Sequence, residues 1–237
     1  MITQAIILAG GLGTRLRSAV PDLPKCMAPI LAKPFIGYLM DYLIQQGVTK
    51  FILALGYKSE VVQQYLNTQY GEYNLSYSVE SEPLGTGGAI ALAFTKAESE
   101  DCLVLNGDTF FAVDLKKLSV FHAETGAACT LALKPMQNFD RYGTVSLGEA
   151  GQVTGFHEKQ KTADGLINGG VYALKKAALL HSTQPSHFSF ETDFLYPSVE
   201  LGNLRGLVEN QYFIDIGIPE DYERAQTELI NNVESNG

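Results

Sequence analysis

Cysteine is scarce in this chain of 237 residues. Its three cysteines, Cys26, Cys102 and Cys129, are odd in number and far apart. They form neither a disulfide framework nor the close spacing of a metal-binding motif, and they predict free thiols in a reducing cytoplasm. No apolar run approaches the ~20 residues needed to cross a bilayer. The short apolar N-terminus has no basic leader, which predicts a buried strand and not a signal peptide.

Basic residues are outnumbered as well. Lys and Arg total 17 against 26 Asp and Glu, giving a formal net charge of −9. This balance argues against partners such as nucleic acid or an anionic membrane surface. A phosphorylated small substrate stays compatible with it, because a local cluster of positive charge, aided by metal ions, is enough to bind one.

Strands and helices alternate through the first half of the chain. Strands are expected at 2–9, 51–55, 75–79 and 102–105. Helices are expected at 35–46, 59–66 and 86–94, the second capped by Ser59. This alternation indicates right-handed βαβ units and a parallel sheet, hence an α/β fold.

The pattern changes after about residue 125. Short strands are expected at 127–133, 144–147, 153–156, 169–173 and 204–209. They indicate antiparallel or mixed additions to the same sheet. Helices are expected near 175–181, near 190–201 and from Pro219 onward. One domain is predicted over 1–232, with halves of about 1–125 and 126–232, followed by a frayed tail at 233–237.

A glycine-rich turn, AGGLGTRL, follows the first strand directly. Successive N–H groups in such a turn form an anion-binding nest, and Arg15 adds a planar fork suited to phosphate. The turn does not match G-x-x-x-x-G-K-[ST], which excludes a Walker-type site. Leu16 stands where a dinucleotide fingerprint needs a small residue, and no acidic residue ends the second strand, which argues against a Rossmann dehydrogenase. Ten residues on, Lys25 lies in a frame stiffened by prolines.

The turn AGGLGTRL followed by PKCMAPI resembles the signature of the sugar-1-phosphate nucleotidyltransferases. The glycine loop, arginine and proline-lysine element occur in the family's order. Cys26 departs from it, since many members have proline there. The resemblance runs from residue 4 to about residue 226. It implies a Rossmann-like three-layer α/β/α sandwich with a mostly parallel mixed central sheet, the fold of the nucleotide-diphospho-sugar transferases.

Three further segments complete the nucleotide side of this resemblance. ESEPLGTGGA matches the family's base-reading region, and its helix start is expected to offer free N–H donors. Asp108 follows the fourth strand, and Asp215 lies in an apolar run, a costly place for an unpaired carboxylate. The resemblance makes both ligands of Mg²⁺. The nucleotide-binding residues it implies are Leu8, Ala9, Gly10, Gly11, Gly13, Thr14, Arg15, Lys25, Glu80, Pro83, Leu84, Gly85, Thr86, Gly87, Asn106 and Gly107.

Later segments resemble the family's sugar side. The sugar phosphate-binding residues implied are Tyr142, Gly143, Glu158, Lys159, Asn168, Gly169 and Glu191, with Lys159 facing the phosphate. The segments NGDTFFAVDL, FDRYGTV and YFIDIGIPEDY resemble those of one subgroup of the family. That subgroup converts D-glycero-α-D-manno-heptose 1-phosphate and GTP to GDP-heptose and pyrophosphate. No hexapeptide repeats are seen, so no left-handed helical extension is expected.

The resemblance implies that the sugar phosphate attacks the α-phosphorus, with Arg15, Lys25 and Asp108 as catalytic residues. A uridylyl- or thymidylyltransferase for a hexose 1-phosphate stays open, as does a molybdopterin guanylyl- or cytidylyltransferase, although the sugar-side elements at 158–172 argue against the latter. A non-catalytic nucleotide-sugar sensor would be expected to lack Lys25, Asp108 or Asp215. The 12 Tyr and 12 Phe leave room for a homo-oligomer interface without locating one.

Overall fold

The computed structural model describes residues 1–11, 13–16, 18–181 and 186–234. Its strands are β1 (Gln4–Leu8), β2 (Pro29–Ile30), β3 (Lys33–Pro34), β4 (Lys50–Leu55), β5 (Asn74–Val79), β6 (Asp101–Asn106), β7 (Thr109–Phe111), β8 (Cys129–Phe139), β9 (Thr144–Leu147), β10 (Val153–His157), β11 (Thr162–Lys175), β12 (Leu204–Val208) and β13 (Phe213–Asp215). Its helices are α1 (Phe35–Gln45), α2 (Ser59–Tyr70), α3 (Gly85–Phe94), α4 (Leu115–Thr125), α5 (Lys176–Leu180), α6 (Tyr196–Ser198) and α7 (Pro219–Glu234), with single turns η1 (Lys25–Met27), η2 (Glu149–Gly151) and η3 (Phe190–Leu195).

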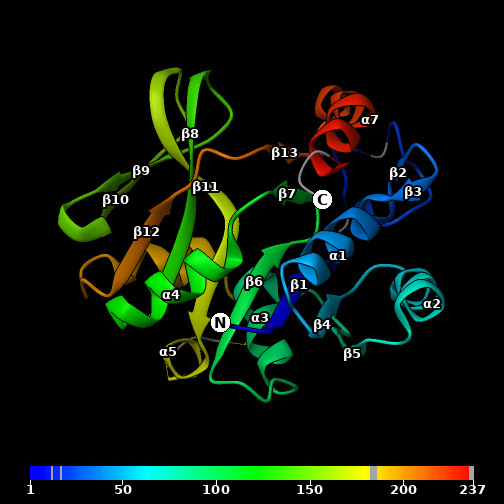
Figure 1. Cartoon of the computed structure of the whole chain (residues 1–237), viewed down its shortest axis with the longest axis horizontal. Coiled ribbons are helices and arrows are strands. Elements are labelled where there is room, and N and C mark those ends of the chain that lie inside the picture. Colours follow the sequence, from blue (N-terminus) through cyan, green and yellow to red (C-terminus); the bar gives the residue numbers. More distant parts are fainter. Residues whose placement is uncertain (12, 17, 182–185, 235–237) are drawn as a thin grey trace.

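The central sheet is mixed. Its strands run in the order β10-β9-β11-β6-β1-β4-β5, while β8 pairs with β11 and β12 pairs with β8 (Figure 1). The block β5-β4-β1-β6 is parallel, as the alternation of strands and helices predicted. The long strand β11 then joins β6 in antiparallel fashion and links the parallel block to the second half. The mixed additions expected after residue 125 are therefore confirmed.

Helices cover both faces of this sheet, which makes three layers. Neighbouring residues on β1 show the division, because side chains alternate across a strand. Ile7 packs in the core that contains α1, α2, α4 and α7 residues, whereas Ile6 packs in the core that contains residues of α3, α5 and η3. The expected α/β/α sandwich is thus confirmed. Among the described residues, no helix combines the length and the apolar character required to cross a membrane.

Two local expectations were wrong or incomplete. Helix α2 begins at Ser59, but its N-cap is Lys58 in the left-handed region (φ 49°), and no side chain caps it. Helix α4 was not predicted, although Asp114 caps it by accepting a hydrogen bond from the Lys117 N–H at 2.9 Å. The capping aspartate before an apolar run was the overlooked signal. The tail predicted at 233–237 was wrong for its first two residues, because α7 runs to Glu234, and its last three lie outside the described residues.

The C-terminal helix lies against the segment that follows the glycine loop (Figure 1). Tyr222 donates a hydrogen bond from its hydroxyl to the Pro29 carbonyl at 2.7 Å, and the Gln226 side chain both donates to Pro29 and accepts from the Leu31 N–H. These contacts hold α7 beside β2 and β3, at the edge of the sheet where the parallel strands have their carboxyl ends. That edge carries the site.

Candidate active site

A cavity of about 810 Å³ opens at the carboxyl ends of β1, β4 and β6. Ligands in open α/β sheets gather at this edge. Every predicted nucleotide-binding residue except Leu84 and Gly87 lines the cavity, as do both predicted metal ligands, Asp108 and Asp215. The other described lining residues are Cys26, Ala54, Gly56, Tyr57, Ser81, Glu82, Ala89, Thr109, Arg141 and Gly217.

Lys25 and the two aspartates converge at the centre of this cavity. The Lys25 ammonium forms an ion pair with Asp108 Oδ2 and lies 3.5 Å from Asp215 Oδ1. The lysine follows Pro24 in the single turn η1, and its side chain is only 16% exposed. Three residues from distant parts of the chain therefore form one charged cluster.

A two-stranded ladder places Asp215 beside Asp108. Strand β13 pairs antiparallel with β7, so that Asp215 lies opposite Thr109, and the Ile216 N–H donates to the Asp108 carbonyl at 3.0 Å. Asp215 also accepts a hydrogen bond from the Gly217 N–H at 2.8 Å. Burial raises the pKa of Asp215, with the charge of Asp108 adding to the rise and that of Lys25 opposing it.

The glycines of the first loop permit close approach to this cluster. Gly13 has φ +58°, and a Cβ on it would lie 3.0 Å from the Lys25 Cβ. A Cβ on Gly107 would lie 2.7 Å from the Leu8 carbonyl, which instead accepts a hydrogen bond from the Gly107 N–H. The turn after β6 is thus held against the end of β1. Thr14 and Arg15 are exposed on the cavity wall.

The start of α3 differs from expectation. The N–H groups of Gly87 and Gly88 both donate to the Phe188 carbonyl, at 3.0 and 3.4 Å. The expectation of free donors at this helix start was therefore wrong for these two residues, and Gly87 lies against the Phe188 ring instead of the cavity. Glu80 reaches across the loop, because its Oε2 accepts from the Leu84 N–H at 3.0 Å.

The balance of charge suits a cation. Three basic residues, Arg15, Lys25 and Arg141, and four acidic ones, Glu80, Glu82, Asp108 and Asp215, are among the described residues that line the cavity. In the same part of the chain, no group of three or more His, Cys, Asp or Glu side chains converges to hold a metal. A pair of carboxylates fits Mg²⁺, which completes its coordination with water and substrate phosphates.

The predicted sugar-side residues lie outside this cavity lining. Glu158 and Lys159 are exposed after β10, and the Asn168 amide donates to the Tyr172 hydroxyl at 2.8 Å. Burial raises the pKa of Tyr196, and the charges of Glu191 and Glu158 raise it further. Both carboxylates therefore lie near one tyrosine, whose ring stacks on Phe156 at 4.8 Å.

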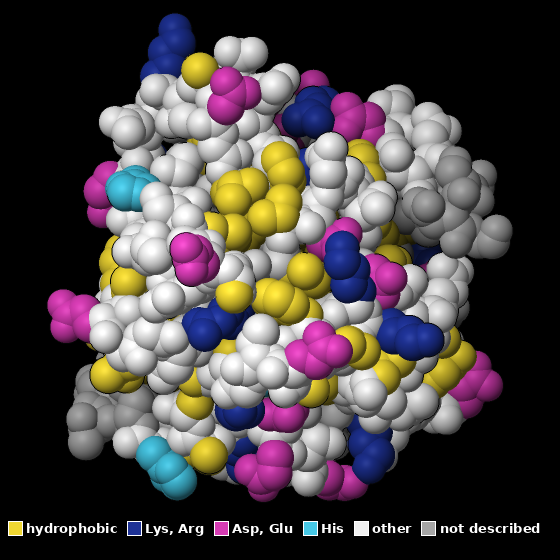
Figure 2. Space-filling model, turned by 60° about the vertical axis from the view of Figure 1, so that its left-hand side comes forward, with side chains coloured by type: hydrophobic (Ala, Val, Ile, Leu, Met, Phe, Trp, Pro, Cys, Tyr) yellow, Lys and Arg dark blue, Asp and Glu magenta, His cyan; other side chains and the backbone are white. Residues whose placement is uncertain are grey.

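Close packing holds the remaining sugar-side positions. A Cβ on Gly169 would lie 2.4 Å from the Phe111 ring, and one on Gly143 would lie 2.4 Å from the His157 carbonyl. Tyr142 packs edge-on against Phe213 with ring centroids 6.0 Å apart. These contacts join the sugar-side strands to β7 and β13, the ladder that carries the aspartates. On the face shown in Figure 2, basic and acidic side chains are interspersed and form no extended basic surface.

Sequence reasoning missed several lining residues, and Arg141 is the most informative of them. Its neighbour Tyr142 was identified within FDRYGTV, so the signal was a cation adjoining a recognised motif. Cys26 also lines the cavity, but burial raises the pKa of its thiol to about 12, with the Asp108 charge adding to the rise. It therefore stays a thiol near neutral pH and offers no nucleophile.

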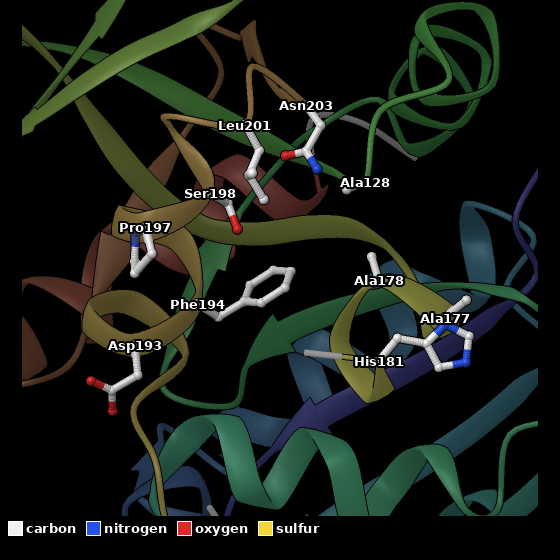
Figure 3. A pocket seen from close by; sticks show the side chains of 10 residues that line it. All are labelled: Ala128, Ala177, Ala178, His181, Asp193, Phe194, Pro197, Ser198, Leu201 and Asn203. Carbon is white, nitrogen blue, oxygen red and sulfur yellow. The ribbon is translucent and has the colours of Figure 1, made fainter. Parts of the chain in front are cut away.

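A second cavity of about 590 Å³ lies between α5, η3 and α6 (Figure 3). Phe194 points into it, and His181, Asp193 and Asn203 place polar groups at its rim. No predicted site residue is among those that line it. The predicted nucleotide-binding residues and metal ligands that line a cavity all line the one at the sheet edge.

Comparisons with known proteins identify the family of the chain. The family model described as Nucleotidyl transferase matches residues 4–232. The chain belongs to the nucleotidyl transferase family. This nucleotidyl transferase is 49% identical to the D-glycero-alpha-D-manno-heptose 1-phosphate guanylyltransferase of Aneurinibacillus thermoaerophilus, over 95% of the chain and 98% of that relative. It is 48% identical to the enzyme of the same name from Campylobacter jejuni, over 97% of the chain and all of the relative.

A solved structure supports the fold of this nucleotidyl transferase. The crystal structure of HddC from Yersinia pseudotuberculosis complexed with GMP-PN matches it with a TM-score of 0.86 at 38% identity. The match covers 96% of this chain and all of that one. The resemblance inferred from the glycine loop and the proline-lysine element is confirmed.

Proposed function

We propose that this protein is a guanylyltransferase that joins D-glycero-α-D-manno-heptose 1-phosphate to the GMP moiety of GTP, releasing pyrophosphate. The observation that carries the proposal is the convergence of Lys25, Asp108 and Asp215 in the cavity at the sheet edge. Both relatives at nearly half identity bear this activity in their names. We also propose that the protein works in the cytoplasm, because its three buried free cysteines suit a reducing compartment.

The chain's own residues would act by alignment and charge. The attacking oxygen of the sugar phosphate is already anionic, so no strong base is needed, and the obstacles are repulsion and orientation. Arg15 and the N–H groups of the glycine loop would hold the triphosphate. Lys25, held in place by both aspartates, would offset charge near the α-phosphate and the leaving pyrophosphate.

Asp108 and Asp215 would hold Mg²⁺, which when bound supplies charge stabilisation at the α-phosphate. The support is the donor chemistry of the pair and the burial that raises the pKa of Asp215. Two neighbouring carboxylates repel each other when both are ionised, which makes the ionised form of each costly. A cation placed between them stabilises the ionised form of both. The Lys25 ammonium partly fills this role in the protein itself.

The base side of the cavity offers carboxylates. Guanine carries an exocyclic amino group and a ring N–H on one edge, and a carboxylate can accept hydrogen bonds from both. Glu80 and Glu82 line the cavity, and Glu80 is already engaged by the Leu84 N–H. Glu82 is therefore the residue we propose to read guanine.

The function is tested by pyrophosphate release. Wild-type protein is assayed with GTP, ATP, UTP, CTP and dTTP against D-glycero-α-D-manno-heptose 1-phosphate, mannose 1-phosphate and glucose 1-phosphate. We expect the highest kcat/KM with GTP and the heptose phosphate. An Asp108→Asn variant serves as the control and is expected to be inactive. Preference for UTP or dTTP with glucose 1-phosphate would reject the proposed specificity. Nucleotide binding without turnover would instead indicate a non-catalytic nucleotide-sugar sensor.

A further inference from the structure

Arg141 is a third cation on the cavity wall. It follows β8 in the second half of the chain, whereas Arg15 and Lys25 come from the first 25 residues. Its side chain is 37% exposed, and its guanidinium lies 5.6 Å from the centre of the Tyr142 ring. The cavity thus receives positive charge from both halves of the chain.

Asp221 fixes the orientation of this guanidinium. One nitrogen of Arg141, Nη1, donates to Asp221 Oδ2, and Arg224 Nη1 donates to the other oxygen, Oδ1, at 2.8 Å. The Asp221 carboxylate is 9% exposed and sits in the first turn of α7. Because each of its oxygens has an arginine partner, the carboxylate is held from two sides. In the described part of the chain, Arg141 makes no other hydrogen bond, so Nε and Nη2 can meet a ligand.

Arg141 lies on the Asp215 side of the central cluster. Its guanidinium faces the ring of Tyr142, and that ring packs edge-on against Phe213 of β13, the strand that ends at Asp215. The glycine loop with Arg15 occupies the nucleotide side, beside Leu8 and Ala9 at the end of β1. In an in-line displacement the attacking and leaving groups lie on opposite sides of the phosphorus that is transferred. A cation on the Asp215 side is therefore placed for the attacking group.

We propose that Arg141, held in place by Asp221, binds the phosphate of the sugar 1-phosphate acceptor. The inference rests on the proposed function and adds a residue to that site. The lysine expected to face this phosphate, Lys159, is exposed and does not line the cavity. A planar guanidinium with two free donor nitrogens can donate parallel hydrogen bonds to two oxygens of a phosphate. Arg141 thus supplies a phosphate contact that lies at the reaction centre.

The test separates acceptor binding from nucleotide binding. Steady-state KM values for D-glycero-α-D-manno-heptose 1-phosphate and for GTP are measured for wild type, Arg141→Gln, Arg141→Lys and Arg224→Gln. Arg224 is the matched control, because it bonds the same carboxylate but does not line the cavity. Thermal melting of each variant establishes that it is folded.

We expect Arg141→Gln to raise the KM for the heptose phosphate on the order of 10- to 100-fold, the worth of a charge-assisted hydrogen bond, with the KM for GTP nearly unchanged. Arg141→Lys should recover part of the loss, since it keeps the charge and loses the fork. Arg224→Gln should leave both KM values near those of wild type. Calorimetric titration of the heptose phosphate, in the presence of Mg²⁺ and a non-hydrolysable GTP analogue, should show the same order of affinities.

An unchanged KM for the heptose phosphate in folded Arg141→Gln would overturn the inference while the proposed function stands. An equal rise in Arg224→Gln would do the same, because it would assign the effect to the anchoring of α7. If wild type neither turns over nor binds the heptose phosphate, the proposed function fails, and the inference fails with it.

Discussion

Replacing Lys25 by methionine removes the cation at the centre of the cavity and keeps most of the length of the side chain. The ammonium lies 3.5 Å from Asp215 Oδ1 and forms an ion pair with Asp108. At 3.5 Å, two unit charges interact by about 5 kcal/mol for an effective dielectric constant near 20. Desolvation offsets much of this gain, and a hydrogen bond to a charged group contributes about 1.5–3 kcal/mol net.

We expect Lys25→Met to lower kcat on the order of 10²- to 10³-fold, as loss of one preorganised donor does in other enzymes. The two carboxylates then face each other without an intervening cation, so Mg²⁺ should raise the melting temperature of the variant more than that of wild type. Turnover is measured by pyrophosphate release at saturating substrates, and melting by circular dichroism with and without Mg²⁺.

Lys50→Met is the matched control, because Lys50 pairs with Glu98 on the surface, away from the cavity. Surface ion pairs contribute about 0–1 kcal/mol, so this variant should keep its turnover and nearly its stability. A folded Lys25→Met variant with kcat close to wild type would refute the role of Lys25. A melting response to Mg²⁺ equal to that of wild type would refute the placement of the metal between the aspartates.

Three other changes test separate parts of the structure. Gly13→Ala should lower kcat on the order of 10²-fold, because the added Cβ would crowd Lys25. Gly126→Ala is the control, since Gly126 has a similar φ of +61° and no atom within contact distance of an added Cβ. It should lower the free energy of unfolding by only roughly 1–2 kcal/mol and leave kcat unchanged. Glu82→Gln should reduce the preference for GTP over ATP on the order of tenfold in kcat/KM, and an unchanged ratio would exclude Glu82 as the guanine reader. Burial lowers the pKa of His122, so the unfolded state binds the proton more readily and stability falls as the pH drops below about 6.5. Urea unfolding of wild type at pH 7.5 and 5.5 should show this loss, at most about 1.4 kcal/mol per pH unit, and His122→Gln should show less of it.

The sequence by itself was sufficient where the determining contacts are local. The glycine loop and the proline-framed Lys25 follow one another within about twenty residues. Their backbone conformations follow from the residue types, because glycine permits tight turns and proline restricts φ. The parallel block β5-β4-β1-β6 likewise follows from strands and helices alternating along the chain. The family resemblance rested on these same segments, which explains why it was confirmed.

Only the tertiary structure decided what distant segments do to one another. Asp215 meets Asp108 because β13 pairs with β7, a contact that no local pattern encodes. The donors expected at the start of α3 are taken by the carbonyl of Phe188, which lies about a hundred residues later in the chain. Arg141 lines the cavity and donates a hydrogen bond to Asp221, which lies 80 residues later in the chain. Strands and side chains that are remote in the sequence meet only when the whole chain is folded. The residues that line the cavity could therefore be identified only from the tertiary structure.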